Sequence, residues 1–351
     1  MNKVHFFLLY VFLFSCGNES RIQPDVNNKV SVEPTKVLKT TLPTYVFPQV
    51  KDLDSYANTE FLPTLESDLD KNKNAVYAAS LLMAWDEIEK IIGSDLSDFD
   101  SEELEEMFNS TSHKKVLLSN EYKTEIEIEG TQIIAKAEFS KALPFSYPLT
   151  KNNEMLMFGQ GKVNSFGFRG AQQMTRIVFY NSDNDFCISI TPRDAHHSIY
   201  LLKSDKYEST FRKNFDKIGQ KRRKQSDDKY NQWKKYLKST DVAKIPMIEF
   251  NVNANYPRIE NSEFLNSSFD RFRVLKAIQR TAFILNEKGA IVESEALMAV
   301  DAASEAIGAI ENMPTPKNLI FDKKFMVFLK REKAEYPYFA VQITDTELLT
   351  K

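Results

Sequence analysis

The chain reads Arg273-Val-Leu-Lys-Ala-Ile-Gln-Arg-Thr-Ala-Phe-Ile-Leu-Asn-Glu-Lys-Gly289 near its C-terminus, and this stretch decides the fold. Apolar residues alternate in part up to Leu285, which predicts a β-strand, and Asn286–Gly289 is a turn signal. About thirty residues without a strand pattern follow, before strands resume in 319–329 and 335–343. A loop of that length inside a compact domain is uncommon and is usually functional or disordered.

This order of strand, long loop and strand resembles the serpin family. In that family a strand ending in a Glu-x-Gly hinge leads into an exposed bait loop, and a Phe-Asn-x-Pro-Phe strand follows. The matching residues here are Glu287-Lys-Gly289 and Phe321-Asp-Lys-Lys-Phe325. The resemblance implies an α+β fold with mixed, mainly antiparallel sheets, packed helices and a long exposed loop.

Further motifs extend the resemblance unevenly over residues 74–343. Phe139-Ser-Lys-Ala-Leu-Pro-Phe145 is similar to a family motif at the top of the main sheet, and 241–255 is similar to the leucine-proline-lysine strand. Gln279 stands where the family usually has a histidine in its shutter region. The segment between the first helix and Thr131 is much shorter than in ordinary serpins, so we expect the helical part to be reduced.

Two helices and a series of strands are predicted from periodicity. Asn74–Ile92 has apolar residues at helical spacing and predicts an amphipathic helix. Ser101 precedes a glutamate-rich turn, which predicts a helix over 101–109 with Ser101 as its N-cap. The predicted strands lie at 122–128, 131–139, 163–168, 175–180, 186–192 and 245–252.

The N-terminus predicts a bacterial lipoprotein signal peptide over residues 1–15. Val4–Phe14 is an apolar run too short to span a bilayer, and Leu13-Phe-Ser-Cys16 resembles a lipobox. We expect lipid on Cys16 to hold the chain in the membrane; an ordinary signal peptide with an incidental cysteine is the alternative. Residues 16–45 predict a flexible tether and 46–351 a single domain. The expected location is the bacterial cell envelope, at the outer membrane or cell surface.

Composition and rare residues exclude several functions. The chain is 42% hydrophobic and 27% charged, and its net charge of −3 provides no field for nucleic acid. The basic cluster Lys221–Lys224 is interpreted as a solvated helix face rather than a polyanion site. Cys187 fits a buried strand, and His196 and His197 are adjacent, so they point apart. No phosphate loop, nucleophile elbow or zinc motif occurs, which favours a protein that is no enzyme, with no catalytic residues, metal or cofactor.

The resemblance also implies a mechanism. In the family, a serine or cysteine protease cuts the bait loop, and the freed segment inserts as a strand into the central sheet with the acylated protease attached. The hinge would comprise Glu287, Gly289, Ala290, Val292 and Ser294, and the family spacing would put the cut between Ala303 and Ser304. Ala303 would favour a protease with a small, elastase-like pocket, bound through residues 290–313.

Alternation within the loop is compatible with insertion. Ala290, Val292 and Ser294 begin a row of uncharged residues that continues through 296, 298 and 300, while Glu293 and Glu295 fall on the other face. A register slip of one residue would bury two carboxylates, at a cost of several kcal/mol each.

Two functions therefore remain open. One is a surface lipoprotein that inhibits a serine-type or cysteine endopeptidase through a cleavable loop. The other is a non-inhibitory binding lipoprotein on the same fold, because the bulky Ile291 and Val292 replace the alanines of rapidly inserting members. Residues 294–313 are also rich in helix formers and could form a packing or partner-binding helix.

Overall fold

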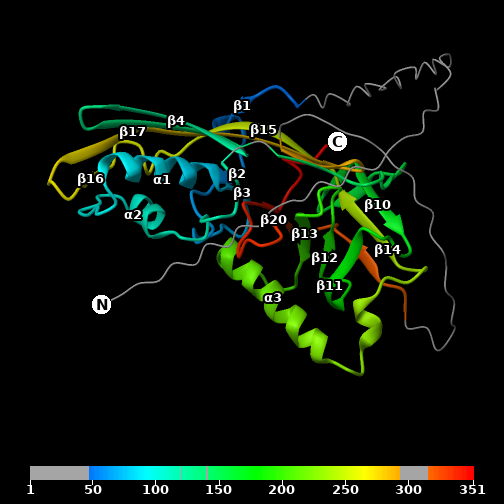
Figure 1. Cartoon of the computed structure of the whole chain (residues 1–351). Helices are drawn as coiled ribbons and strands as arrows, with labels where there is room; N and C mark the ends of the chain where they lie inside the picture. Colours follow the sequence, from blue (N-terminus) through cyan, green and yellow to red (C-terminus); the bar gives the residue numbers. More distant parts are fainter. Residues whose placement is uncertain (1–46, 120, 140, 293–314) are drawn as a thin grey trace, which may run out of the picture. The chain divides into compact units, whose positions relative to one another are not determined.

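A computed structural model describes residues 47–292, except 120 and 140, and residues 315–351; the side chains of Glu138, Phe139 and Val292 are not described (Figure 1). All of these residues fall in one compact unit that extends from Thr41 to Lys351. The first described element begins at Lys51, so a chain that starts at Gly17 keeps every described helix and strand.

The largest sheet, called the broad sheet below, has eight strands. They are β1 (Lys51–Asp52), β4 (Tyr122–Glu129), β5 (Gln132–Phe139), β6 (Lys141–Pro144), β15 (Ile248–Asn255), β16 (Glu263–Leu265), β17 (Arg271–Asn286) and β18 (Gly289–Val292). β17 is the longest strand, and it pairs with β15, β16, β18 and β5. The stretch that opened the sequence analysis is therefore the organising strand of the structure.

A second sheet has seven strands, and a third has four. The seven are β2 (Thr59–Phe61), β3 (Asn74–Ala78), β11 (Thr175–Ser182), β12 (Asp185–Ile190), β13 (His197–Lys203), β20 (Phe325–Arg331) and β21 (Phe339–Ile343). The four are β7 (Thr150–Lys151), β10 (Ser165–Arg169), β14 (Val242–Pro246) and β19 (Asn318–Ile320). A separate hairpin joins β8 (Leu156–Phe158) to β9 (Gly161–Val163).

Three α-helices and two short 3-10 helices occur within the described ranges. They are α1 (Ser80–Ile92), α2 (Glu102–Asn109), α3 (Phe211–Asp227), η1 (Leu53–Ser55) and η2 (Gln232–Lys235). Among the described strand pairings only β1–β15, β14–β19, β5–β17 and β2–β3 are parallel. The predicted α+β class, with mainly antiparallel sheets and few helices, is confirmed.

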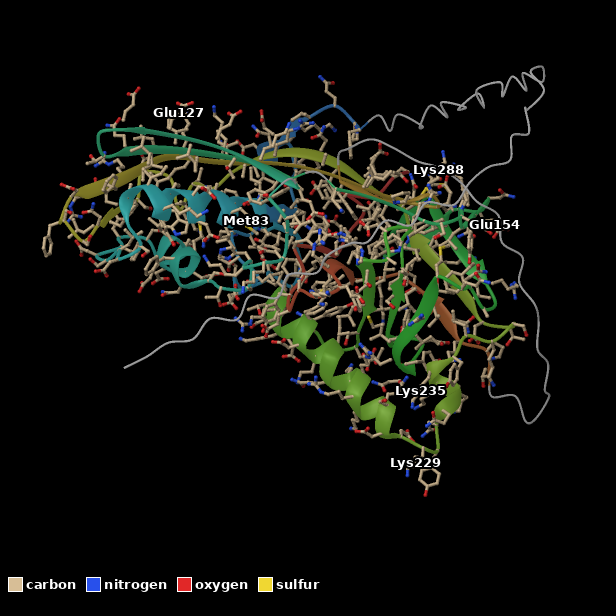
Figure 2. All side chains as sticks on the ribbon, viewed as in Figure 1. Met83, Glu127, Glu154, Lys229, Lys235 and Lys288 are labelled. Atoms are coloured by element: carbon tan, nitrogen blue, oxygen red, sulfur yellow. The ribbon has the colours of Figure 1, made fainter. Side chains whose placement is uncertain are left out.

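The core lies between the broad sheet and the seven-stranded sheet. Phe283 of β17 meets Phe339 of β21 with ring centroids 4.6 Å apart. Helix α1 packs beside β3 against β4, β5 and β17, and α3 rests on the seven-stranded sheet, where Phe215 contacts Phe328. At β4 the opposite face of the broad sheet is polar: Glu127 projects away from it in Figure 2. Where β17 pairs with β18 the same face carries the buried Ile284 and Ile291.

One helix prediction was wrong at its start. Residues Asn74–Ala78 form β3, and the helix begins only at Ser80. All five residues of β3 are buried between β2 and β21, so both flanks of the backbone are satisfied by neighbouring strands. This tertiary pairing overrides the helical spacing that Leu81, Leu82 and Trp85 continue. The helix with Ser101 as N-cap is confirmed, since the Ser101 side chain accepts a hydrogen bond from the Leu104 N–H.

Candidate functional site

The candidate site is built around the turn that ends β17. Asn286 closes the turn by accepting a hydrogen bond from the Lys288 N–H on its Oδ1 atom, at 2.9 Å. The carbonyl of Lys288 accepts from the Phe145 N–H at 2.8 Å, and that of Glu287 accepts from the Leu149 N–H at 2.8 Å. The turn is therefore fixed to the segment that follows β6.

After this turn the chain runs back between two strands of the broad sheet. β18 is antiparallel to β17 on one side, with Ile284 opposite Ile291, and antiparallel to β6 on the other, with Ile291 opposite Ala142. Ala290 and Ile291 are both fully buried, and Ala290 belongs to the core. The strand starts immediately after the turn, where the sequence had indicated no strand pattern, and the last described residue of the segment is Val292.

Gly289 is required where β18 begins. Its φ of +143° lies in a region that L side chains rarely adopt. A Cβ atom would also lie 2.6 Å from the Leu143 carbonyl oxygen and 2.7 Å from the Pro144 Cα atom. Both neighbours are backbone atoms of β6, so no side-chain rotation could relieve the contact. Glycine is what allows the chain to approach β6 so closely.

Strand β17 has different neighbours along its length, β5 in its N-terminal part and β18 at its C-terminal end. From Arg273 to Arg280 it pairs in parallel with β5, and among the described residues its pairing with β18 begins at Ile284. We call Thr281, Ala282 and Phe283 the fork. The Thr281 hydroxyl is buried there without a hydrogen-bond partner in the described structure, which is a local cost in free energy.

Gln279 lies two residues before the fork in β17, and its side chain joins the broad sheet to the seven-stranded sheet. Its Nε2 atom donates to the Ala78 carbonyl at 2.9 Å and to Ser80 Oγ at 2.8 Å, and its Oε1 atom accepts from the Tyr256 hydroxyl at 2.7 Å. Gln279 has no exposed surface. This network fixes β17 to the junction of β3 and α1. Gln279 lies within the part of β17 that pairs in parallel with β5.

A charged cluster holds the first residue of β6. The Lys141 ammonium donates to the Glu121 carboxylate at 2.7 Å, and Arg331 donates to the same oxygen at 2.7 Å. Burial alone would raise the pKa of Glu121, but hydrogen bonds from Arg331, from the Leu118 N–H and from Lys141 outweigh it and lower the pKa to about 2. The carboxylate is therefore charged at neutral pH and fixes Lys141, the residue that pairs with Val292.

His197 is buried beside this cluster. Its Nδ1 atom shares a hydrogen bond of 3.0 Å with the Tyr338 hydroxyl, and its Nε2 atom lies 3.5 Å from Asp194 Oδ2. Burial, reinforced by the nearby Lys141, lowers the pKa of His197 to about 4. The imidazole is therefore neutral at pH 7, while the neighbouring His196 is exposed on the surface.

A buried ion pair lies close to the point where the described chain resumes at residue 315. Lys317 precedes β19, and its ammonium lies 3.0 Å from Asp241 Oδ2 and donates to the Tyr236 carbonyl at 2.9 Å. The Lys317 N–H donates to the other Asp241 oxygen at 2.9 Å. Both side chains are 1% exposed. The chain thus rejoins the four-stranded sheet at a fixed point.

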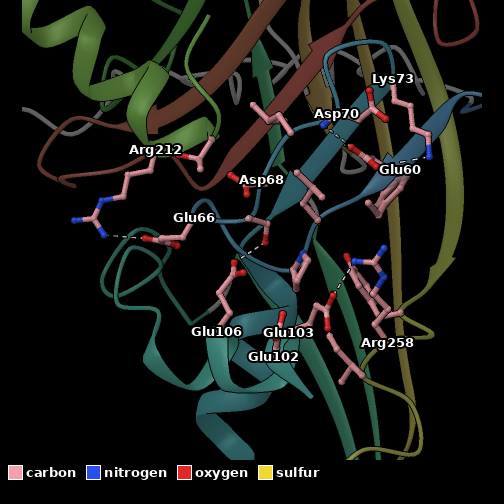
Figure 3. A pocket seen from close by; sticks show the side chains of 18 of the residues that line it. Glu60, Glu66, Asp68, Asp70, Lys73, Glu102, Glu103, Glu106, Arg212 and Arg258 are labelled. Carbon is pink, nitrogen blue, oxygen red and sulfur yellow. Dashed lines mark hydrogen bonds and ion pairs between the residues drawn. The ribbon is translucent and has the colours of Figure 1, made fainter. Parts of the chain in front are cut away.

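A separate cleft of about 1060 Å³ opens beside β2 and α2 (Figure 3). Its walls carry eight carboxylates and four cationic side chains. Glu66 pairs with Arg212 at 2.9 Å, Glu103 pairs with Arg258 at 2.8 Å, and Glu106 accepts hydrogen bonds from the hydroxyls of neighbouring residues. Three of the eight carboxylates are therefore tied to the fold, and we assign the cleft no reaction.

The residues available for chemistry are sparse in the described structure. Burial raises the pKa of the Cys187 thiol, so no thiolate forms at neutral pH. Within the described ranges no group of three His, Cys, Asp or Glu side chains is arranged to hold a metal ion. No helix there is long and apolar enough to cross a bilayer.

The structure places only part of the predicted hinge. Glu287 is half-buried in the turn, Gly289 and Ala290 are buried in β18, and Val292 is described only by its backbone. Cys16, Ser294, Ala303 and Ser304 lie outside the described residues.

Sequence reasoning missed Glu121, Lys141, Arg331 and the role of Lys317. Glu121 and Arg331 are separated by 210 positions, and the 76 positions between Asp241 and Lys317 include the long loop. Charged residues at such separations give no local signal. One sequence signal could have suggested an anchor: Lys317 stands directly before a predicted apolar strand.

Comparison with solved structures finds distant serpins. Serpin48 of the insect Tenebrio molitor is 14% identical with a TM-score of 0.33, and a serpin of the trematode Schistosoma haematobium is 13% identical with a TM-score of 0.37. Native protease nexin-1 with heparin is 12% identical with a TM-score of 0.36. Each match takes in 61% of this chain and 56% of the other, so the chain spans little more than half the length of these serpins. No family model matches the chain. No curated protein matches it.

Proposed function

We propose that this chain is a serpin-like inhibitor of a serine or cysteine endopeptidase, with residues 290–313 as the bait. The observation that carries the proposal is the position of β18. Four residues that follow the turn already lie as an antiparallel strand between β17 and β6. The insertion that the family resemblance implies would extend this strand beyond Val292, through the fork.

The register of β18 allows us to calculate how many loop residues could pair with β17 in the broad sheet. Ile291 faces Ile284, so each further residue of the loop would meet the preceding residue of β17. In that register Ala302 would meet Arg273, where the parallel ladder with β5 begins. This endpoint is one residue before Ala303, and it supports a cut between Ala303 and Ser304.

The same register sorts the loop side chains by face. Ala290 lies in the core, and strand alternation would place Val292, Ser294, Ala296, Met298, Val300 and Ala302 on the same side. Glu295 would meet Arg280 on the opposite face. Buried Val and Met side chains each stabilise the inserted form by about 1.5–3 kcal/mol.

Insertion would exchange one type of pairing for another. β5 and β17 would separate along their parallel ladder, and the incoming strand would form antiparallel pairs with both. Parallel pairing is slightly less stable per residue than antiparallel pairing, and the inserted strand would form hydrogen bonds on both flanks, with successive residues bonding to alternate neighbours. The buried Thr281 hydroxyl at the fork has no hydrogen-bond partner among the described residues, and this adds to the free energy that opening could release.

Two further elements of the proposal concern the ends of the loop. The Lys317–Asp241 pair would keep the distal part attached to the four-stranded sheet after a cut. At the N-terminus, lipid on Cys16 would tether the inhibitor to the outer membrane or cell surface, where it would meet proteases that attack the envelope. In this proposal the chain has no enzymatic activity of its own.

A non-inhibitory binding lipoprotein is the second candidate. It is favoured by Ile291, a bulky residue that is fully buried at the position where rapidly inserting serpins carry alanine. A slow loop would be cut before it inserted, and the fold would then act only as a scaffold for a partner.

Denaturing gels distinguish the two candidates. The chain lacking residues 1–16 is incubated with elastase-, subtilisin- and trypsin-like proteases. A covalent adduct of higher mass, together with greater heat stability after cleavage, supports inhibition. Clean cleavage between Ala290 and Met313, with no adduct and an unchanged Tm, would contradict inhibition.

A matched pair of variants connects the adduct to β18. Ala290→Glu would place a carboxylate in the core and prevent the strand from forming, so the adduct should disappear while cleavage continues. Lys288→Glu makes a charge change in the exposed turn and should keep the adduct. Equal adduct yield from both variants would contradict insertion through β18.

A further inference from the structure

A strongly basic protrusion lies at the end of helix α3. We call residues 221–238 the basic tip: the last residues of α3, the following turn and η2. The segment contains eight Lys and Arg residues and two Asp residues, within a chain whose net charge is −3. The rest of the chain is therefore acidic, and positive charge is concentrated at this point.

Four of the eight cations at the basic tip, Arg222, Arg223, Lys224 and Lys229, are exposed. Lys221 is neutralised by Asp185, at 2.6 Å. Arg222, Arg223 and Lys224 are exposed, and none of them forms an ion pair with a described residue. These three charges remain in water although they are adjacent in sequence.

Asp227 and Asp228 offset only part of this charge, because two carboxylates against eight cations leave the segment with a net charge of +6. Asp228 Oδ1 accepts hydrogen bonds from the N–H groups of Tyr230 and Asn231, at 3.0 and 3.1 Å, and Oδ2 accepts from Asn231 Nδ2 at 2.7 Å. The carboxylate is thus directed at the turn itself. Lys229 follows it near the outermost end of the protrusion in Figure 2, and Lys235 lies above it in that view.

Two aromatic side chains accompany the cations. Tyr230 is 96% exposed and Tyr236 is 64% exposed, although large aromatic rings usually bury most of their surface. Tyrosine has an apolar ring and a polar end, a combination that is enriched where proteins meet the membrane–water interface.

The base of the basic tip is rigid. Trp233 packs edge-on against Tyr180 with centroids 5.9 Å apart, and the Lys317 ammonium lies 5.2 Å from the Trp233 ring centroid. Lys317 also holds the Tyr236 carbonyl at 2.9 Å. The exposed cations and tyrosines are therefore presented on a fixed support, so docking would lose little conformational entropy.

We propose that the basic tip docks the domain on the surface of an anionic phospholipid bilayer. The unpaired cations would attract the phosphate headgroups, and Tyr230 and Tyr236 would enter the headgroup region. Such cations contribute about 1 kcal/mol each near an anionic bilayer. A DNA duplex would use the same charges, but its stacked bases could not contact a pair of exposed rings on a protruding turn. The proposal does not depend on whether the loop inhibits a protease.

Sedimentation with vesicles tests this docking. The chain lacking residues 1–16 is mixed with vesicles of 30% phosphatidylglycerol in phosphatidylcholine, or of phosphatidylcholine alone, in 0.1 M salt. We expect binding only to the anionic vesicles, and its loss in 0.5 M salt, where charges are screened. Arg222→Gln/Arg223→Gln/Lys224→Gln should weaken binding about 100-fold.

The control removes the same charge elsewhere: Lys51→Gln/Lys151→Gln/Lys162→Gln changes three exposed lysines and should bind as the unaltered chain does. Tyr230→Ser/Tyr236→Ser should weaken vesicle binding at least threefold while leaving binding to a DNA duplex unchanged. Equal loss in the two charge variants would overturn the proposal. So would DNA binding as tight as vesicle binding together with insensitivity to the tyrosines, which would identify a polyanion site instead.

Discussion

Replacing Gly289 with alanine tests the position of β18 directly. The new Cβ atom would lie 2.6 Å from the Leu143 carbonyl oxygen, 2.7 Å from the Pro144 Cα atom and 2.9 Å from the Phe145 nitrogen. All three are backbone atoms, so β6 or β18 would have to move. The φ of +143° adds strain of about 1–3 kcal/mol for a residue with a side chain.

The expected loss in the free energy of unfolding is about 3 kcal/mol. Overpacking against a fixed backbone costs about 1–3 kcal/mol in addition to the strain. The total has a ceiling, because β18 can leave the sheet and then forfeits the burial of Ile291, which is worth about 1.5–3 kcal/mol. Detachment is therefore the cheaper response, and we expect Gly289→Ala to release β18.

Gly130→Ala is the matched control. Gly130 has a φ of +61° in the turn between β4 and β5, and an added Cβ would meet nothing within 4 Å. It should lose only about 1 kcal/mol, from the left-handed conformation alone. Urea unfolding gives both values, and hydrogen exchange over residues 284–292 should quicken at least tenfold in Gly289→Ala only. Equal losses with unchanged exchange would refute the placement of β18 between β17 and β6.

Three further predictions concern buried polar groups. Lys317→Met leaves Asp241 charged and buried, and should cost about 3–5 kcal/mol in urea unfolding, whereas changing both residues to apolar ones should cost much less. Gln279→Leu removes three buried hydrogen bonds and should lower the unfolding free energy by about 2–4 kcal/mol, with a lower Tm in calorimetry. The unfolded chain protonates His197 near pH 6.5 but the folded chain only near pH 4, so stability should fall by about 3 kcal/mol as pH drops through that window, and His197→Gln should not show this loss. Below pH 4.5, protonation of Glu121 should continue the decline in both proteins, which acid titration of the unfolding midpoint would detect.

Local patterns were enough to predict much of the fold. The alternation in β17, the turn at Asn286 and the N-cap at Ser101 all depend on residues close in sequence, and all three occur as predicted. Residues 74–78 misled because a fully buried strand carries no alternation. Its apolar residues simply continued the helical spacing of α1.

The candidate site was predicted less completely. Gly289 can be recognised from its turn, but β18 is only four residues long and is stabilised by β6, a strand nearly 150 positions earlier. The cluster around Glu121 joins residues from three distant segments, and the Lys317–Asp241 pair bridges the loop itself. Such groups become visible only when the sheets have assembled.

The length of β17 sets a distance as well as a register. Thirteen residue steps separate Arg273 from Asn286, and at about 3.3 Å per step this part of the strand is about 43 Å long. In the proposed mechanism, the severed end at Ala303 would travel to the far end of β17, while Lys317 stayed where it is. With one dye on each side of the cut, this separation would appear as a fall in energy transfer between the two dyes. A protease bound covalently to the severed end would move the same distance.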